Sequence, residues 1–104
     1  MKRRISVLLA DNHRMVRDAI ARCLQATGDI SVLARVDDAE KAISQAAALR
    51  PNVVLLDTEM PGLDSFRASL VIRTRSPGSR PVFVSAFLYD RYVDLALAVN
   101  ASGY

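Results

Sequence analysis

The sequence predicts an α/β domain in which helices cover both faces of a parallel β-sheet. Short apolar runs alternate with segments whose apolar residues recur at helical spacing, throughout the 104 residues. The apolar runs are continuous, as in strands that are buried on both faces of a sheet. Because crossovers between parallel strands are right-handed, this alternation favours a sheet between two helical layers.

The first strand–helix unit begins with ISVLLA, Ile5 to Ala10. The helix expected next has apolar residues at helical spacing, namely Met15, Val16, Ala19, Ile20, Cys23 and Leu24. Gly28 is expected to end this helix. Cys23 is the only cysteine, so no disulfide can form within the chain, and its spacing favours a thiol buried in the core.

The second unit starts with a strand at residues 31–36. Asp37 and Glu40 then stand three residues apart, which is the spacing of a capping box at a helix start. The inward face of that helix is expected to consist of Ala39, Ala42, Ile43, Ala46 and Ala47. Pro51 separates this helix from the next strand.

The third strand is expected at Val53 to Asp57, followed by a loop through Pro61 and Gly62. A helix near residues 65–74 would then follow. Its inward-facing side chains are expected to be Phe66, Leu70 and Val71.

The fourth strand is expected at residues 81–85, after a turn with the composition SPGSRP. Asp90 can cap a further helix, and Gly103 and Tyr104 look like the start of a fifth strand. The apolar positions of that helix include Val93, Leu97 and Val99. Because the sequence contains no repeat and no linker, residues 1–104 are expected to form one domain.

Composition and charge exclude several classes of protein. The longest apolar runs are far too short to cross a bilayer, and the amino terminus lacks the features of a signal peptide, so a cytoplasmic protein is expected. The net charge of +3 comes from arginines scattered along the chain, which favours a solvated surface over a nucleic-acid-binding face. The turn after the first strand, ADNHRM, contains no glycine, which argues against a nucleotide-binding site.

Polar residues follow three of the predicted strands, at the point where each strand ends. They are Asp11 and Asn12 after the first strand, Asp57 at the end of the third and Ser85 at the end of the fourth. One strand-end acid alone is usually a turn or cap residue, but ligands of parallel sheets bind at this edge, so the combination predicts a shared site. A carboxylate there suits a nucleophile or a ligand for a hard cation.

His13 stands beside these residues, and imidazole is a common ligand of transition metals. A single histidine next to hard oxygen ligands is nevertheless a weak signal. We therefore expect His13 to be a loop or helix-start residue.

Four stretches resemble a known family: LLADNHRMVRDAI, PNVVLLDTEMPGLDSF, VFVSAF and ALAVNASGY. They are similar to the receiver domains of two-component response regulators, and most similar to the LuxR/NarL-type subgroup, which has a carboxyl-terminal helix-turn-helix. The resemblance covers the whole chain in order. It implies a flavodoxin-like open parallel sheet with strand order 2-1-3-4-5.

The resemblance also implies a role for each residue of the predicted site. Asp57 matches the phosphoacceptor, which takes a phosphoryl group from a sensor histidine kinase. Asp11, the Asp57 carboxylate and the backbone carbonyl of Glu59 would hold Mg²⁺, while the Glu59 side chain is expected to be a solvated loop charge. Ser85 matches the hydroxyl residue that contacts the phosphoryl group.

Two further residues match the family's switch. Ala86 matches the small residue that leaves the phosphoryl group accessible, and Tyr104 matches the aromatic switch residue on strand five. On this reading the protein is not an enzyme.

The sequence departs from the family at two places. The second member of the family's acidic pair is Asn12 here, which offers a carbonyl oxygen but no charge. One charge pair at 4 Å contributes roughly 1 to 4 kcal/mol between water and a protein surface, so the affinity for Mg²⁺ is expected to be lower. The sequence also stops at Tyr104, so we expect the domain to lack the end of strand five and the final helix.

Three functions remain open from the sequence. In the first, a phosphorylated receiver switches an output. DNA would be bound only through an output domain outside these residues, a homodimer is possible, and no membrane contact is expected. The second is a phosphorylation-independent pseudo-receiver that binds another protein, which Asn12 favours. The third is a phosphatase of the haloacid dehalogenase type with Asp57 and Glu59 at its centre, but the chain has no room for the additional motifs that such an enzyme needs.

Overall fold

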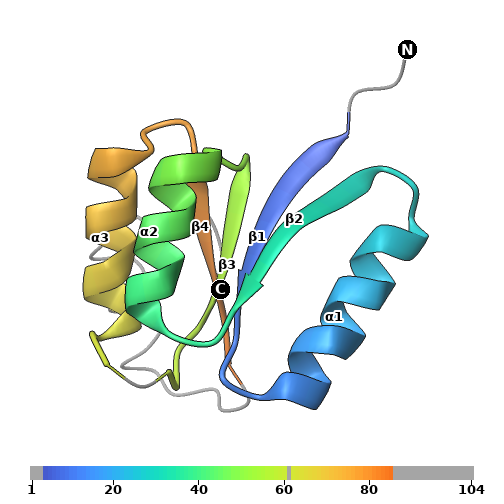
Figure 1. Ribbon diagram of the computed structural model, residues 1–104, viewed down its shortest axis with the longest axis horizontal. Helices are drawn as coiled ribbons and strands as arrows, with labels where there is room; N and C mark the ends of the chain where they lie inside the picture. Colours follow the sequence, from blue (N-terminus) through green and yellow to red (C-terminus); the bar gives the residue numbers. More distant parts are fainter. Residues whose placement is uncertain (1–3, 61, 86–104) are drawn as a thin grey trace.

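The computed structural model describes residues 4–60 and 62–85. Within these residues, four parallel strands form one sheet in the order β2-β1-β3-β4 (Figure 1). The strands are β1 (Ile5–Ala10), β2 (Ile30–Val36), β3 (Val53–Asp57) and β4 (Arg80–Val84). This order confirms the flavodoxin-like arrangement up to the fourth strand. The expected fifth strand and the helix after Asp90 lie outside the described residues.

The helices of the described region are α1 (Arg14–Ala26), α2 (Ala39–Leu49) and α3 (Ser65–Arg75). Helices α2 and α3 pack side by side on one side of the sheet, and α1 lies on the other side (Figure 1). The prediction of helices on both faces is therefore confirmed. None of the helices described is long and apolar enough to cross a membrane.

The core lies between the sheet and the α2–α3 layer. Leu8, Val54, Leu56 and Ile72 are fully buried there. Phe83 of β4 packs against Phe66 of α3, with 4.5 Å between the ring centroids. Each such side chain contributes about 1.5–3 kcal/mol when it is buried completely, so this layer fixes the strands that carry the polar residues at the sheet edge.

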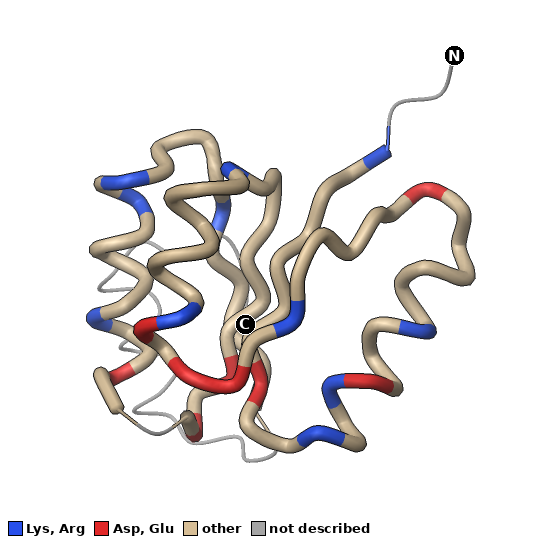
Figure 2. The backbone as a smooth tube through the Cα atoms, in the orientation of Figure 1, with Lys and Arg blue, Asp and Glu red and all other residues tan. Residues whose placement is uncertain are grey.

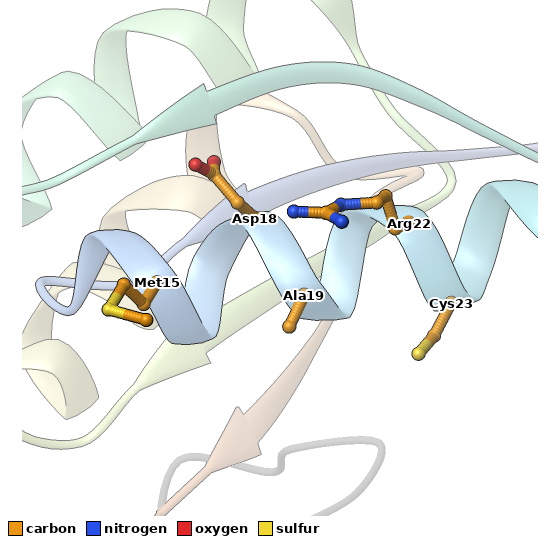
Figure 3. Close-up of a pocket in the computed structure, with 5 residues that line it drawn as sticks. All are labelled: Met15, Asp18, Ala19, Arg22 and Cys23. Atoms are coloured by element: carbon orange, nitrogen blue, oxygen red, sulfur yellow. The ribbon is translucent and has the colours of Figure 1, made fainter.

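The prediction that the Cys23 thiol lies in the core is wrong, because Cys23 is exposed. Of the other apolar residues at helical spacing in α1, Met15 is 86% exposed and Val16 is 49% exposed, while Ile20 and Leu24 are half-buried. In Figure 3, Met15, Ala19 and Cys23 point to the same side of α1 and line a surface pocket. The buried residue of α1 is Ala21.

Arg17 makes a contact that the hydropathy pattern of α1 does not predict. Arg17, four residues before Ala21, is half-buried, and its guanidinium group donates a hydrogen bond to the backbone oxygen of Asp11 at 3.0 Å. An arginine can be partly buried while its charged end binds a polar group. A pattern that counts only apolar residues therefore does not reveal the contact between Arg17 and the turn before α1.

Two smaller predictions are also corrected. Asp38, rather than Asp37, caps α2, because its side chain accepts a hydrogen bond from the Lys41 amide at 2.7 Å. Asp37 instead contacts the Lys41 ammonium group at 2.9 Å, and that pair lowers the pKa of Asp37. Leu70, predicted to face inward, is 47% exposed, because Ile72 fills the core from the last part of α3.

Candidate functional site

The polar residues at the carboxyl ends of the strands converge, as predicted. One pocket is lined by Asp11, Asn12, His13, Asp57, Glu59 and Ser85, among others. Figure 2 shows acidic residues gathered around this lower edge of the sheet. The pocket therefore combines groups from the ends of β1, β3 and β4.

Asp57 is the most constrained of these residues. Its strand pairs with β1 on one side and β4 on the other, and Asp57 itself stands opposite Val84. The Ser65 hydroxyl donates a hydrogen bond to the Asp57 backbone oxygen at 2.6 Å. The continuous apolar strand and this bond fix the Asp57 carboxylate at the sheet edge.

The two carboxylate oxygens of Asp57 have different surroundings. Oδ1 accepts a hydrogen bond from the Glu59 amide at 3.0 Å. Oδ2 is buried and accepts no hydrogen bond from residues 4–60 or 62–85. A buried anionic oxygen without a partner is costly unless a cation or another donor binds it. A cation or hydrogen-bond donor that enters this pocket is therefore expected to bind Oδ2.

Burial raises the pKa of Asp57 above its ordinary value. The neighbouring Asp11 carboxylate raises that pKa further, while the amides of Glu59 and Asn12 lower it. The net effect shows that the folded protein disfavours the negative charge at this position. A bound cation would relieve this cost.

Asp11 lies beside Asp57 and is only 4% exposed. Its Oδ1 atom accepts a hydrogen bond from the His13 amide at 2.7 Å, and its own amide donates to the Val36 oxygen at 3.0 Å. With the Arg17 bond to its backbone oxygen, these contacts hold the turn between β1 and α1. Arg17 was missed as part of this turn, and no spacing rule in the sequence identifies it.

The other predicted site residues have more varied positions. Asn12 and Glu59 have exposed side chains, and Ser85 is half-buried directly after β4. Ala86 and Tyr104 lie outside the described residues, as does Pro61 of the loop after β3.

His13 begins α1 as its N-cap residue, which confirms the expected helix-start position. Its side chain makes no capping hydrogen bond. The Nδ1 atom instead lies 3.4 Å from Asp11 Oδ1 and 3.6 Å from Asp57 Oδ2. His13 is next to the Asp11–Asn12 pair in the sequence, and the fold also brings it close to Asp57.

The donor set of the pocket fits a divalent cation. Ligand atoms of Asp11, His13 and Asp57 all lie within 4.8 Å of one another. The carboxylate oxygens are the ligand type that Mg²⁺ prefers, and the buried Asp57 Oδ2, which has no hydrogen-bond partner among residues 4–60 and 62–85, is available to bind it.

Comparisons with known proteins agree with this architecture. The sequence matches the family model of the response regulator receiver domain over residues 7–104. It is 32% identical to the response regulator GacA of Pseudomonas viridiflava over 96% of this chain and 47% of that protein. It is 31% identical to the nitrate/nitrite response regulator protein NarL of Escherichia coli over 95% of this chain and 46% of that protein.

Solved structures give the same result. The signal receiver domain of the response regulator NarL from Mycobacterium tuberculosis superposes with a TM-score of 0.92 at 30% identity, covering 97% of this chain and 82% of that one. A LuxR-family DNA-binding response regulator from Staphylococcus aureus superposes with a TM-score of 0.89 at 28% identity, covering 96% and 83%. The chain spans about half the length of the curated relatives it matches. The match to the family model over residues 7–104 shows that this chain belongs to the response regulator receiver domain family.

Proposed function

We propose that this domain takes a phosphoryl group from a sensor histidine kinase onto Asp57 and thereby switches an output. The observation that carries the proposal is the position of the Asp57 carboxylate. The Asp57 side chain is only 8% exposed, and the Glu59 amide holds its Oδ1 atom. Its Oδ2 atom accepts no hydrogen bond from the residues that the structure describes. Such a group is oriented for attack, and only its outer side is open to a partner.

The reaction would be a transfer between two protein side chains. One oxygen of the Asp57 carboxylate forms a bond to phosphorus, and the bond between phosphorus and the imidazole nitrogen of the kinase breaks, leaving the electron pair on that nitrogen. Orientation and charge neutralisation make up most of the catalytic contribution in such a transfer. The hydrogen bond from the Glu59 amide to Oδ1 fixes the orientation of the Asp57 carboxylate.

Receiver domains bind Mg²⁺ through an acidic pocket, and we propose the same ion here. The side chains of Asp11 and Asp57 and the backbone carbonyl of Glu59 would hold it, with Asn12 offering an uncharged oxygen. When bound, Mg²⁺ supplies positive charge for the phosphoryl oxygens.

The family suggests how the new phosphoryl group would be read. Ser85 would donate a hydrogen bond to it, Ala86 would leave space beside it, and Tyr104 would change position as Ser85 moves. Ser85 borders the same pocket as Asp57, which supports the first of these roles.

The output would be regulation of transcription. One relative is named as the transcriptional regulatory protein NarL of Mycobacterium tuberculosis, and one similar structure is a DNA-binding response regulator. DNA would be bound through an output domain that lies outside these residues. On the basis of family membership we also propose a cytoplasmic location and a homodimer as an assembly.

A second function is favoured by one observation. Asn12 supplies no charge at the position of the family's second acid, and its side chain is exposed at the pocket. A site with one negative charge fewer binds Mg²⁺ less tightly, so the domain would then act as a phosphorylation-independent protein-binding module.

Intact-mass measurement after incubation with acetyl phosphate separates the two functions. The wild type should gain one phosphoryl group in the presence of Mg²⁺ and much less in its absence. Asp57→Asn should gain none. Asp37→Asn is the matched control, because it removes an exposed carboxylate at the same sheet edge. If folded wild-type protein gains no phosphoryl group with Mg²⁺, the phosphoacceptor function is wrong.

A further inference from the structure

We propose that His13 is a third side-chain ligand of the metal site and that the site prefers first-row transition-metal ions to Mg²⁺. The inference rests on the proposed metal site at Asp57, but it concerns which ion binds there. It therefore adds a ligand and a metal class to the acidic pocket of the family.

The distances around His13 do not fit hydrogen bonds. Nδ1 lies 3.4 Å from Asp11 Oδ1 and 3.6 Å from Asp57 Oδ2, whereas an N–H···O hydrogen bond is about 2.7–3.2 Å long. Two ligands that each lie about 2.0–2.2 Å from one ion, at angles of roughly 90–110°, are about 3–3.5 Å apart. Both distances from His13 Nδ1 are therefore close to the spacing of two ligands of one ion, and the ligand atoms of all three side chains lie within 4.8 Å of one another.

A second observation points to the same ion. The Asp57 side chain is only 8% exposed, and its Oδ2 atom accepts no hydrogen bond from the part of the chain that the structure describes. This atom is the one that lies beside His13 Nδ1. An ion between Nδ1 and Oδ2 would provide the missing partner.

Helix capping does not explain where the His13 side chain lies. His13 occupies the N-cap position, yet its side chain makes no capping hydrogen bond and is 62% exposed. Capping therefore does not hold the ring in place. The exposed ring can make the small movement that metal binding requires.

The ligand chemistry decides the class of ion. Mg²⁺ is bound almost entirely by oxygen, whereas imidazole suits transition metals such as iron, nickel, copper and zinc. One imidazole and two carboxylates thus favour a transition metal.

The test compares Co²⁺ with Mg²⁺ as the probe ions on the 104-residue chain without an affinity tag. By isothermal titration calorimetry, the wild type should bind Co²⁺ at least about tenfold more tightly than Mg²⁺. His13→Ala should lose at least about tenfold in Co²⁺ affinity and less than about threefold in Mg²⁺ affinity. Met15→Ala is the matched control, because it truncates a side chain two residues away that is 86% exposed, and it should change neither affinity.

A spectroscopic experiment identifies the ligand directly. His13 is the only histidine in the chain, so nitrogen modulation of the imidazole type in the electron spin echo of bound Mn²⁺ must come from this residue. The signal should be present in the wild type and absent in His13→Ala. Its absence from the Mn²⁺-loaded wild type would overturn the proposal, as would an equal loss of Co²⁺ and Mg²⁺ affinity in His13→Ala.

These results are separable from the proposed function. If the wild type forms the Mg²⁺-dependent phosphoadduct but shows no nitrogen modulation, the His13 proposal is wrong and the phosphoacceptor function stands. Nitrogen modulation without a phosphoadduct would support the His13 proposal and overturn the phosphoacceptor function.

Discussion

Replacing Asp57 by asparagine should stabilise the fold at neutral pH when no divalent cation is present. The change keeps the shape of the side chain and its acceptor for the Glu59 amide. It removes a negative charge that burial and the Asp11 carboxylate both disfavour. The new amide group can also donate a hydrogen bond toward the Asp11 carboxylate, which two facing carboxylates cannot do.

The size of this effect follows from the separation of the two acids. Their ligand atoms lie within 4.8 Å of each other. Two unit charges at that distance repel each other by about 0.9 kcal/mol in bulk water and by about 3.5 kcal/mol at the effective dielectric constant of a protein surface. Because the pocket opens to solvent, we expect a gain of about 1–3 kcal/mol in the free energy of unfolding.

Urea unfolding followed by circular dichroism measures this gain at pH 7.5 in the presence of a chelator. In thermal unfolding, a gain of 1 kcal/mol corresponds to a rise of about 4–8 °C in Tm for a domain of this size. Asp37→Asn is the control, because its carboxylate is exposed and ion-paired with Lys41, so its loss should slightly destabilise the protein.

The pH dependence of the free energy of unfolding independently tests whether the Asp57 charge destabilises the fold. Because the pKa of Asp57 is raised, the folded wild type binds more protons than the unfolded chain between the ordinary value near 4 and the raised value. Its free energy of unfolding therefore falls as the pH rises through this range, and Asp57→Asn avoids that loss. The advantage of the variant should disappear below about pH 4. The electrostatic reasoning would be refuted if Asp57→Asn were less stable than wild type at pH 7.5. It would also be refuted if the variant were more stable than wild type by the same amount below pH 4 as at pH 7.5.

Two further substitutions test the contacts that position the site. Asp64→Ala should lower the free energy of unfolding in urea by about 1 kcal/mol, because Asp64 caps α3 by accepting a hydrogen bond from the Phe66 amide at 2.7 Å. Asp64→Asn should be about as stable as wild type. If Asp64→Ala were also as stable as wild type, the cap would not contribute to stability. Ser65→Ala should cost about 1–3 kcal/mol, because it removes a buried hydrogen bond of 2.6 Å to the Asp57 backbone oxygen. A loss below about 0.5 kcal/mol in Ser65→Ala would show that this bond does not hold β3.

The strands could be predicted closely because their burial is continuous. The third strand has the predicted bounds, and β4 begins and ends one residue before its prediction. The sequence also predicted that polar residues would lie together at one edge of the sheet, because the carboxyl ends of parallel strands lie at the same edge. The structure places Asp11, Asp57 and Ser85 there, around one pocket.

The side-chain details of the site could not be predicted in the same way. The hydrogen bond from Arg17 to the Asp11 backbone oxygen could not be predicted, because a hydropathy pattern counts only apolar side chains. The distance from His13 to Asp57 depends on how the chain turns between β1 and α1, which no local spacing encodes. The cap of α2 shifted from Asp37 to Asp38, since two adjacent aspartates satisfy the same rule.

The most direct test of the phosphoacceptor assignment is to locate the phosphoryl group on the chain. An aspartyl phosphate formed with acetyl phosphate and Mg²⁺ can be reduced with borohydride, which converts the modified residue to homoserine. Tandem mass spectrometry should then find homoserine at position 57, with Asp11 and Asp64 unmodified. Homoserine at another position, or none in folded wild-type protein, would contradict the assignment of Asp57.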